Sequence, residues 1–218
     1  CVLKIKYGKI MTISMPKIID AILKGYIEAQ QSYEEMSGGF WLWNAPEYFI
    51  TSNVAQNIYA IEGEKFVTLE HGSTDAIESA GAKGRGRLPK DIREKGRVDI
   101  LLWRADSTPR AIIEIKNQIY SKDQYEKDIT RIKSFLSRNH TNSTLQFGIF
   151  AFYESAFNGI RKTATEKIEA RVNKIFDNSK LILGSNFDIK LYVTDMHDES
   201  ENAWQAACIF VKLKKSVI

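Results

Sequence analysis

Residues 97–116 read RVDILLWR-ADSTP-RAIIEIK, and the fold is organised around this stretch. Two short runs rich in Val, Ile, Leu and Trp flank the turn-forming segment 106–109, a pattern that predicts a β-hairpin. Charged residues interrupt the apolar runs at Asp99, Glu114 and Lys116. Folding the chain about the centre of the turn places Asp99 opposite Glu114. Glu114 and Lys116 lie two residues apart on one strand and therefore share a face.

This convergence of two acids and a lysine predicts a cation site. Directly opposed residues on antiparallel strands have Cβ atoms roughly 4.5–5.5 Å apart, and two carboxylates that close repel each other unless a cation lies between them. A divalent metal beside Lys116 is the natural candidate. The alternative is a solvated hairpin with an ordinary cross-strand charge cluster. The apolar neighbours favour a functional site, because such strands are usually buried on both faces and buried charges are costly unless paired or metal-bound.

Composition sets broad limits on the class of protein. The chain has 218 residues, of which 44% are hydrophobic and 27% charged, as expected for a globular protein. A formal net charge of +4 permits nucleic acid as a partner without requiring it. The two cysteines, Cys1 and Cys208, provide neither a disulfide framework nor a cysteine zinc site, which suits a cytoplasmic location. No apolar run approaches the roughly 18–20 residues of a membrane span, so no membrane partner is expected.

Hydrophobic periodicity predicts one α/β domain over residues 1–218. Helices are expected at 15–37, from Asn44, from Ser121 and after 158–159, and strands at 65–71, at the two arms of the hairpin, at 145–153, at 187–194 and at 203–212. The expected fold is a mixed central sheet flanked by helices. It has an αβββαβ core at 44–153, an extra N-terminal helix at 15–37 and a C-terminal αββ extension at 158–213.

Residues 72–96 are expected to form a long connection that leads into Asp99. Between Lys83 and Arg97, seven basic residues stand against two acidic ones, a local net charge of +5. Glycines among them allow close backbone approach to a ligand, and clustered Lys and Arg attract phosphates. The alternative is a solvated flexible loop. Nucleic-acid contacts are expected from Lys83, Arg85, Arg87, Lys90 and Arg97, and from Gln118, for which an ordinary polar strand end is the alternative.

The aromatic segment 40–43, FWLW, is expected to plug the core between two helices, with a ligand platform as the alternative. This segment and the final two strands could also support a homodimer.

Residues 44–153 resemble the PD-(D/E)XK nuclease superfamily. The core of that family runs helix, three strands, helix, strand, which is the order expected here. Its signature acid falls on Asp99 in the second strand, and its (D/E)-x-K tripeptide falls on Glu114-Ile115-Lys116 in the third. Many members add a glutamate on the first core helix, and Glu47 occupies that place. Glu47 also lies three residues after Asn44, which fits a helix capping box as a structural alternative.

One departure from the family pattern concerns the helix after the hairpin. Some members carry a Q-x-x-x-Y pattern there, and this chain instead has Tyr125, Asp128 and Arg131 at helical spacing. The resemblance therefore identifies no subfamily.

The resemblance implies a metal-dependent phosphodiesterase. Asp99, Glu114 and the backbone carbonyl of Ile115 would hold Mg²⁺, with Mn²⁺ as a substitute, and Glu47 would hold the metal through water. Lys116 would orient or deprotonate the attacking water and stabilise the developing charge. The implied substrate is nucleic acid, with DNA expected and endonuclease and exonuclease action unresolved. The alternative is a catalytically silent member of the fold that binds nucleic acid or a protein partner.

Overall fold

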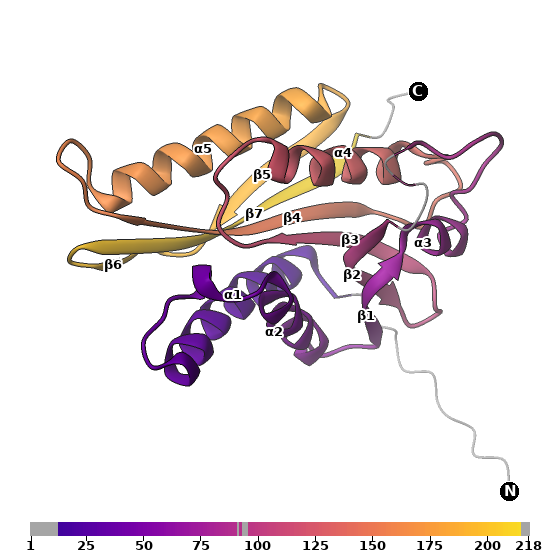
Figure 1. The fold of residues 1–218 in the computed structure, drawn as a ribbon. Helices are drawn as coiled ribbons and strands as arrows, with labels where there is room; N and C mark the ends of the chain where they lie inside the picture. Colours follow the sequence, from indigo (N-terminus) through magenta and orange to yellow (C-terminus); the bar gives the residue numbers. More distant parts are fainter. Residues whose placement is uncertain (1–12, 91, 93–95, 215–218) are drawn as a thin grey trace, which may run out of the picture.

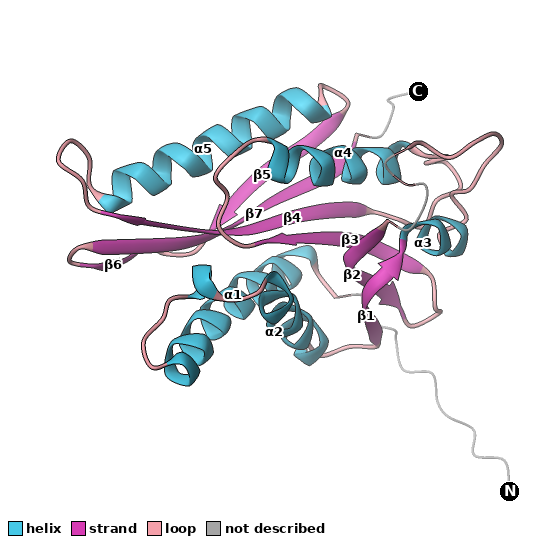
Figure 2. Cartoon of the chain, viewed as in Figure 1, coloured by secondary structure: helices cyan, strands magenta, loops and turns pink. Residues whose placement is uncertain are grey.

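The computed structural model describes residues 13–90, 92 and 96–214, which form a single α/β domain with a mixed seven-stranded sheet flanked by helices (Figures 1 and 2). The helices are α1 (Met15–Ser37), the 3₁₀ turn η1 (Leu42–Asn44), α2 (Glu47–Ala60), α3 (Ser73–Ser79), α4 (Asp123–Ser137) and α5 (Ala164–Leu183). The strands are β1 (Lys65–Gly72), β2 (Arg97–Arg104), β3 (Pro109–Lys116), β4 (Phe147–Phe157), β5 (Phe187–Val193), β6 (His197–Glu199) and β7 (Asn202–Leu213).

The expected hairpin forms as β2 and β3, in the register that the sequence predicts. Ile100 lies opposite Ile113, so Asp99 is brought beside Glu114. Asp106 organises the turn, because its Oδ1 accepts hydrogen bonds from the backbone N–H of Thr108 at 3.0 Å and from the Thr108 hydroxyl at 2.6 Å. A side chain that bonds to backbone two residues ahead is a common device of tight turns.

The sheet has the strand order β1-β2-β3-β4-β7-β5, with β6 paired to β7. Only the β3–β4 pair is parallel within this order, and α4 makes the crossover between its two strands. The prediction of a mixed sheet is therefore confirmed. Because β4 is paired with β3 on one side and β7 on the other, it lies in the interior of the sheet.

Each face of the sheet carries its own hydrophobic core. Helices α4 and α5 cover one face and α1 and α2 cover the other (Figure 1). The first core includes Leu101, Ile112, Ile129, Phe135, Phe150 and Ile168, and the second includes Ile18, Ile22, Ile50, Ile113, Ile115 and Tyr153. Neighbouring residues of β3 thus enter opposite cores, which explains why its sequence is apolar without a polar side.

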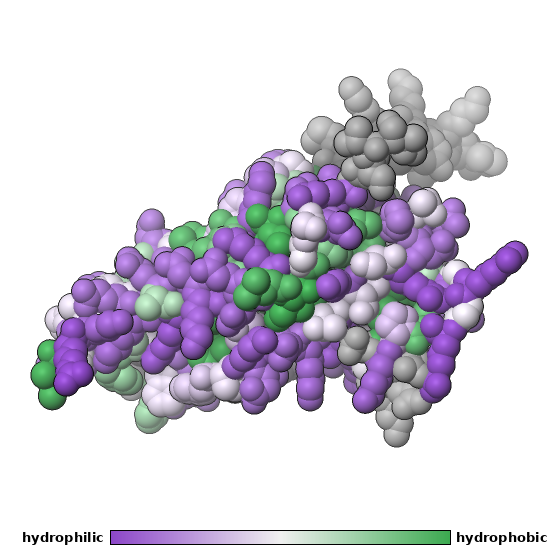
Figure 3. Space-filling model, turned by 90° about the horizontal axis from the view of Figure 1, so that it is seen from above, coloured by the Kyte–Doolittle hydropathy of each residue, from purple (hydrophilic) through white to green (hydrophobic). Residues whose placement is uncertain are grey.

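The outer face over α4 and α5 is mainly hydrophilic, with an apolar group near the middle of the view in Figure 3. None of the helices in the described ranges combines the length and apolar character that crossing a bilayer requires.

Two helices begin later than the sequence predicts. Residues 42–44 form the separate turn η1, and the extended Pro46 precedes α2, so Glu47 is the first helical residue. The predicted capping box between Asn44 and Glu47 is therefore wrong. Helix α4 begins at Asp123 rather than Ser121, and the Gln124 side chain accepts the backbone N–H groups of Tyr120 and Ser121 ahead of the helix.

The connection over residues 72–96 is more structured than expected, since α3 occupies its first part. The buried Ala76 and Ile77 of α3 join the core on the α4 and α5 side. A seven-residue helix is too short for its periodicity to stand out in the sequence, which is why it was not expected. The short strand β6 is likewise an addition to the expected elements.

Substituting Gly25 by alanine is expected to destabilise the packing of α1 on α2. A Cβ atom at position 25 would lie 2.7 Å from the Cα atom of Val54, which is backbone and cannot swing aside. Overpacking of this kind costs about 1–3 kcal/mol, which outweighs the gain of up to about 1 kcal/mol in helix propensity. Urea unfolding measures the change, and Gly38→Ala, at an open position with a φ of 75°, serves as the comparison for backbone strain alone.

Candidate active site

The hairpin brings Asp99, Glu114 and Lys116 together at one end of the sheet. Asp99 is half-buried, and its Oδ2 accepts a hydrogen bond from the backbone N–H of Ile115 at 2.7 Å. Glu114 is 1% exposed. Burial and the negative charge of Asp99 both raise the pKa of Glu114, as expected for two carboxyl groups that lie close together. The structure therefore assembles the three residues that the sequence singles out.

Glu47 reaches the same place from α2. The Lys116 Nζ donates to Glu47 Oε1 at 2.9 Å, and the backbone N–H of Asn117 donates to Glu47 Oε2 at 3.3 Å. With the capping box absent, these contacts are the ones that orient the Glu47 carboxylate. Glu47 thus joins the cluster around Lys116.

The N-terminal helices are fixed to this end of β3 by neutral hydrogen bonds. The buried Tyr26 of α1 donates from its hydroxyl to the backbone carbonyl of Lys116 at 3.1 Å. The Asn117 side chain donates to the carbonyls of Leu42 and Ala45 at 3.0 and 2.9 Å. These bonds hold the start of α2, and with it Glu47, in position over the strand end.

Two further charged residues, Asp128 and Arg131 of α4, complete the cluster. Arg131 Nη1 lies 3.0 Å from each oxygen of Glu114. Asp128 lies between the two cations, with Oδ2 at 3.5 Å from Lys116 Nζ and Oδ1 at 3.5 Å from Arg131 Nη1. The sequence placed both residues at helical spacing without a role. Both residues lie on the side of α4 that faces β3. Because a helix that connects two parallel strands must cover them, charged residues on its buried side are the sequence signal that could have identified this pair.

The cluster has an excess of negative charge, with four carboxylates against two cations. Burial raises the pKa of Asp99 to about 6, although the Ile115 N–H and the Lys116 charge act against this. Burial and the charge of Asp99 raise the pKa of Glu114 well above its usual value. Burial also raises the pKa of Asp128. For Lys116, burial acts to lower the pKa but is outweighed by Asp128, Glu47 and Asp99, so the net shift is upward.

The donor chemistry of this cluster fits a hard divalent cation. Asp99 and Glu114 supply carboxylate oxygens, the ligands that Mg²⁺ and Mn²⁺ prefer, and the excess negative charge is what such an ion would neutralise. The Ile115 carbonyl directly follows Glu114 in the sequence, and Glu47 joins the two acids in space through its contact with Lys116. Within the described ranges no three acidic, His or Cys side chains are grouped closely enough to hold a metal as they stand. Because Arg131 contacts both oxygens of Glu114, a metal would have to share this carboxylate with Arg131.

Among the expected nucleic-acid contacts, Arg97 lies beside the cluster, where its backbone carbonyl accepts a hydrogen bond from Arg131 at 3.1 Å. Lys83 and Arg85 lie past the C-terminal end of α4, next to Arg138. Arg85, Arg87, Lys90 and Arg97 are exposed, and Lys83 pairs with Glu78 at 2.6 Å. The side chain of Arg138, after α4, donates to the carbonyls of Lys83, Arg85 and Gly86 at 2.8–3.0 Å. This part of the connection is therefore held against the protein. Arg93 and Lys95, two further basic residues, lie outside the described residues.

Gln118 is fully engaged by β4. Its side-chain nitrogen donates to Glu154 Oε2 and to the Ser155 carbonyl, both at 3.1 Å, and its oxygen accepts from the N–H and hydroxyl of Ser155. These bonds support the interpretation of Gln118 as an ordinary polar residue at a strand end. Both polar atoms of its side chain are already hydrogen-bonded within the protein, so they are poorly placed to bind a phosphate.

The aromatic segment before α2 fills the core only in part, through Leu42 and the partly buried Trp41, which packs against the core on the α1 and α2 side. Leu42 is buried, but Phe40 is 61% and Trp43 39% exposed. Tyr48, which follows Glu47, is 57% exposed, and Tyr120 in the connection from β3 to α4 is 73% exposed. Exposed aromatic side chains therefore lie on the segments that adjoin Glu47 and Lys116.

The stability of the protein is expected to fall between pH 4.5 and about 7 because of Glu154. Burial raises its pKa from 4.5 to about 7. The folded chain thus keeps this proton over a range in which the unfolded chain has lost it, so the free energy of unfolding decreases as the pH rises. Glu154 alone is expected to contribute a decrease of about 3 kcal/mol, and the raised pKa of Asp99 acts in the same direction.

Urea unfolding of the wild type and of Glu154→Gln across this pH range measures the effect. The variant should lack this contribution, whereas the exposed-site control Glu169→Gln should retain it. A pH profile that Glu154→Gln leaves unchanged would contradict the assignment.

No protein-family model, curated protein or solved structure matches this chain. The side chains of the cluster, rather than a relative, are therefore the basis on which a function can be assigned. Their charge, burial and contacts are described above.

Proposed function

We propose that this protein is a metal-dependent nuclease that hydrolyses phosphodiester bonds, with DNA as the expected substrate. The observation that carries the proposal is the convergence of Asp99, Glu114 and Lys116 at the end of the hairpin. Glu47 contacts Lys116 from a separate helix, so the lysine is oriented rather than loose. An acid pair next to an oriented lysine is a suitable arrangement for phosphodiester hydrolysis with a divalent ion.

The order of elements supports the same reading. From α2 the chain continues through β1, β2 and β3 to α4 and β4, with β3 and β4 parallel and the earlier strands antiparallel. This is the helix, three strands, helix, strand order of the PD-(D/E)XK core, with α3 inserted between β1 and β2. Asp99 and the Glu114–Lys116 tripeptide stand on the second and third of these strands, as the family pattern requires.

Each residue of the cluster has a separate role in the proposed reaction. A bound Mg²⁺ or Mn²⁺ would acidify a water and neutralise charge on the phosphate. Asp99 and Glu114, with the Ile115 carbonyl, would hold that ion. Lys116 lies in ion pairs with Glu47 and Asp128, which hold it as an ammonium. It therefore acts by donating hydrogen bonds to the attacking water and the phosphate oxygens, rather than by accepting a proton.

A cleavage panel tests the proposal. Plasmid, linear duplex and single-stranded DNA, and RNA, are incubated with the protein in Mg²⁺, in Mn²⁺ and in EDTA. We expect cleavage of at least one DNA substrate with metal and none in EDTA. A contaminating nuclease is excluded by a parallel preparation of Asp99→Asn, which should be inactive. Cleavage that persists in EDTA would refute a metal-dependent site.

The alternative function is a catalytically silent member of the same fold that binds nucleic acid or a protein partner. It is favoured by one observation, that Arg131 contacts both oxygens of Glu114 and so neutralises the acid without a metal. Titration with Mg²⁺ and Mn²⁺ by calorimetry separates the two functions. Saturable binding that Asp99→Asn abolishes supports the nuclease, and DNA binding without any metal binding supports the silent protein.

A further inference from the structure

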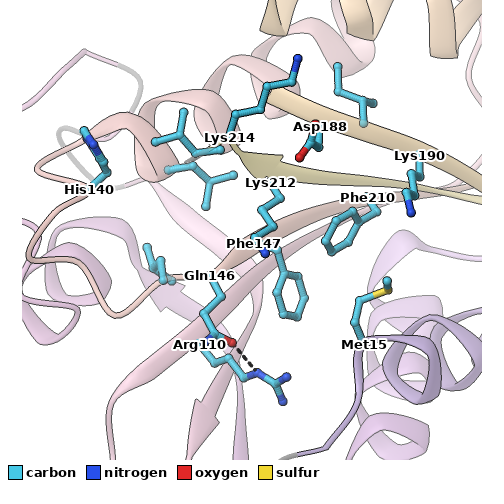
Figure 4. A pocket seen from close by; sticks show the side chains of 14 residues that line it. Met15, Arg110, His140, Gln146, Phe147, Asp188, Lys190, Phe210, Lys212 and Lys214 are labelled. Atoms are coloured by element: carbon cyan, nitrogen blue, oxygen red, sulfur yellow. Dashed lines mark hydrogen bonds between the residues drawn. The ribbon is translucent and has the colours of Figure 1, made fainter. Parts of the chain in front are cut away.

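A cavity lies at the opposite end of the sheet from the candidate active site. It has a volume of about 740 Å³ and opens where β3, β4 and β5 begin and β7 ends (Figure 4). Arg110 lines it at the start of β3, six residues before Lys116. At about 3.3 Å per residue these two positions are about 20 Å apart, so the cavity is separate from the cluster described above.

Arg110 is a buried cation without an acidic partner in the described part of the chain. Its residue is 8% exposed, and its Nε donates to Gln146 Oε1 at 3.1 Å. The guanidinium carbon lies 5.6 Å from the centre of the Phe147 ring. Across the described residues, no carboxylate forms an ion pair with Arg110, and its two terminal nitrogens make no hydrogen bond. These terminal nitrogens are not among the buried side-chain atoms without a partner, so they are open to an anionic ligand in the cavity rather than sealed in the core.

The surroundings of Arg110 increase the positive charge rather than balance it. Burial and the charge of Arg104 both lower the pKa of Arg110, which reflects the cost of this uncompensated cation. Lys190 and Lys212 line the same cavity from β5 and β7, and both are exposed. Asp188, opposite Lys212 across the two strands, is the one acidic side chain among the lining residues.

Most of the remaining lining is apolar, with His140, Gln146 and Lys214 as its polar members. Leu145, Phe147, Ile189, Phe210 and Leu213 contribute to the wall. The Phe147 and Phe210 rings pack against each other with centroids 5.4 Å apart. The cavity volume lies within the roughly 300–1,000 Å³ of small-molecule sites, which are mostly apolar with a few placed polar groups. The cavity thus combines cationic side chains with an apolar, partly aromatic surface (Figure 4).

We propose that this cavity binds a phosphate monoester with an aromatic or apolar body, the chemistry of a nucleotide. The phosphate would be held by the free nitrogens of Arg110, because a guanidinium fork matches phosphate oxygens in pairs. Lys190 and Lys212 would add to the positive charge of the cavity. The body would lie on the apolar wall, where the Gln146 amide and Asp188 carboxylate can select a base by hydrogen bonding. This proposal does not depend on the nuclease function.

Isothermal titration calorimetry on the full chain, without added metal, tests the site with three probes. These are inorganic pyrophosphate, a panel of mononucleotides, and a short oligonucleotide with a 5′ phosphate. We expect at least one mononucleotide to bind at a single site and at least about tenfold more tightly than pyrophosphate, because only the nucleotide uses the apolar wall. Tighter binding of the oligonucleotide would identify a polynucleotide end as the source of the phosphate, which also supports the site.

Variants locate the bound nucleotide. Arg110→Gln is expected to weaken binding at least about tenfold, since a hydrogen bond to a charged group contributes about 1.5–3 kcal/mol. The double variant Lys190→Ala/Lys212→Ala changes only exposed side chains and should also weaken binding several-fold, which keeps the test valid if Arg110→Gln does not fold. Lys17→Ala, at an exposed position on α1, and Lys116→Ala, in the candidate active site, should leave the affinity within about twofold.

Three results would overturn the proposal. They are the absence of saturable nucleotide binding at millimolar concentration, pyrophosphate binding as tightly as any nucleotide, and equal loss of affinity in Lys17→Ala or Lys116→Ala as in the cavity variants. The last would show general electrostatic attraction or binding at the other end of the sheet.

Discussion

Replacing Lys116 by alanine is expected to lower the rate of metal-dependent DNA cleavage by about 10²–10⁴-fold. The Lys116 ammonium lies 2.9 Å from Glu47 and 3.5 Å from Asp128, at the end of the strand that carries Glu114. No other cation contacts both Glu47 and Asp128 within the described residues, so none can take over the donation of hydrogen bonds to water and phosphate. Single-turnover cleavage of a labelled DNA that the wild type cuts measures the loss.

The matched control for this variant is Lys127→Ala. Lys127 is exposed on α4 next to Asp128, so its removal changes the net charge equally without touching the cluster. Circular dichroism establishes that both variants are folded, since removal of Lys116 also leaves Glu47 and Asp128 without their shared partner. Equal cleavage by Lys116→Ala and the wild type would show that the active site lies elsewhere.

Replacing Arg131 by methionine is expected to destabilise the metal-free protein by about 3–5 kcal/mol, the usual effect of removing one partner of a buried ion pair. Glu114 is 1% exposed, and Arg131 contacts both of its oxygens, so the carboxylate would be left buried and unpaired. The loss should shrink as the pH falls, because protonation of Glu114 removes the unpaired charge. Chemical unfolding at several pH values measures it.

A double-mutant cycle with Glu114→Gln isolates the pair from other effects of the substitution. In the double variant most of the stability should return, since neither a buried charge nor its partner remains. The two candidate functions differ in the response of Arg131→Met to metal. If the protein is the nuclease, the freed Glu114 should bind Mg²⁺ more tightly than in the wild type, and Mg²⁺ should restore stability. A variant that Mg²⁺ leaves unchanged would contradict a metal role for Glu114.

The hairpin and its register could be predicted because they depend on local chemistry. Turn residues at 106–109 and apolar arms of equal length leave one pairing that buries both strands, and Ile100 indeed lies opposite Ile113. The N-terminal helix was also predictable, because Pro16 opens it and Gly38, with a φ of 75°, ends it. Both features are encoded within about two dozen neighbouring residues.

The rest of the cluster could not be predicted in this way, because it depends on how distant elements pack. Arg131 meets Glu114 only because α4 crosses the face of β3 on which Glu114 lies. The sequence left Gln118 open to a phosphate contact or an ordinary polar strand end, and only its partners in β4, whose alignment with β3 no local pattern gives, favour the strand end. Glu47 fitted a local capping box, and only the tertiary contact with Lys116 shows which role it takes.

The interior position of β4 has a consequence for biosynthesis. Strand β4 is almost entirely apolar, and its second neighbour, β7, is encoded some 45 residues after it ends. Until residues 202–213 have left the ribosome, a nascent chain that already contains every residue of the candidate cluster therefore exposes an unpaired apolar edge. Such edges pair readily with other chains. We therefore expect chaperones to be needed during this interval, and messages truncated before β7 to yield aggregates rather than a smaller active protein.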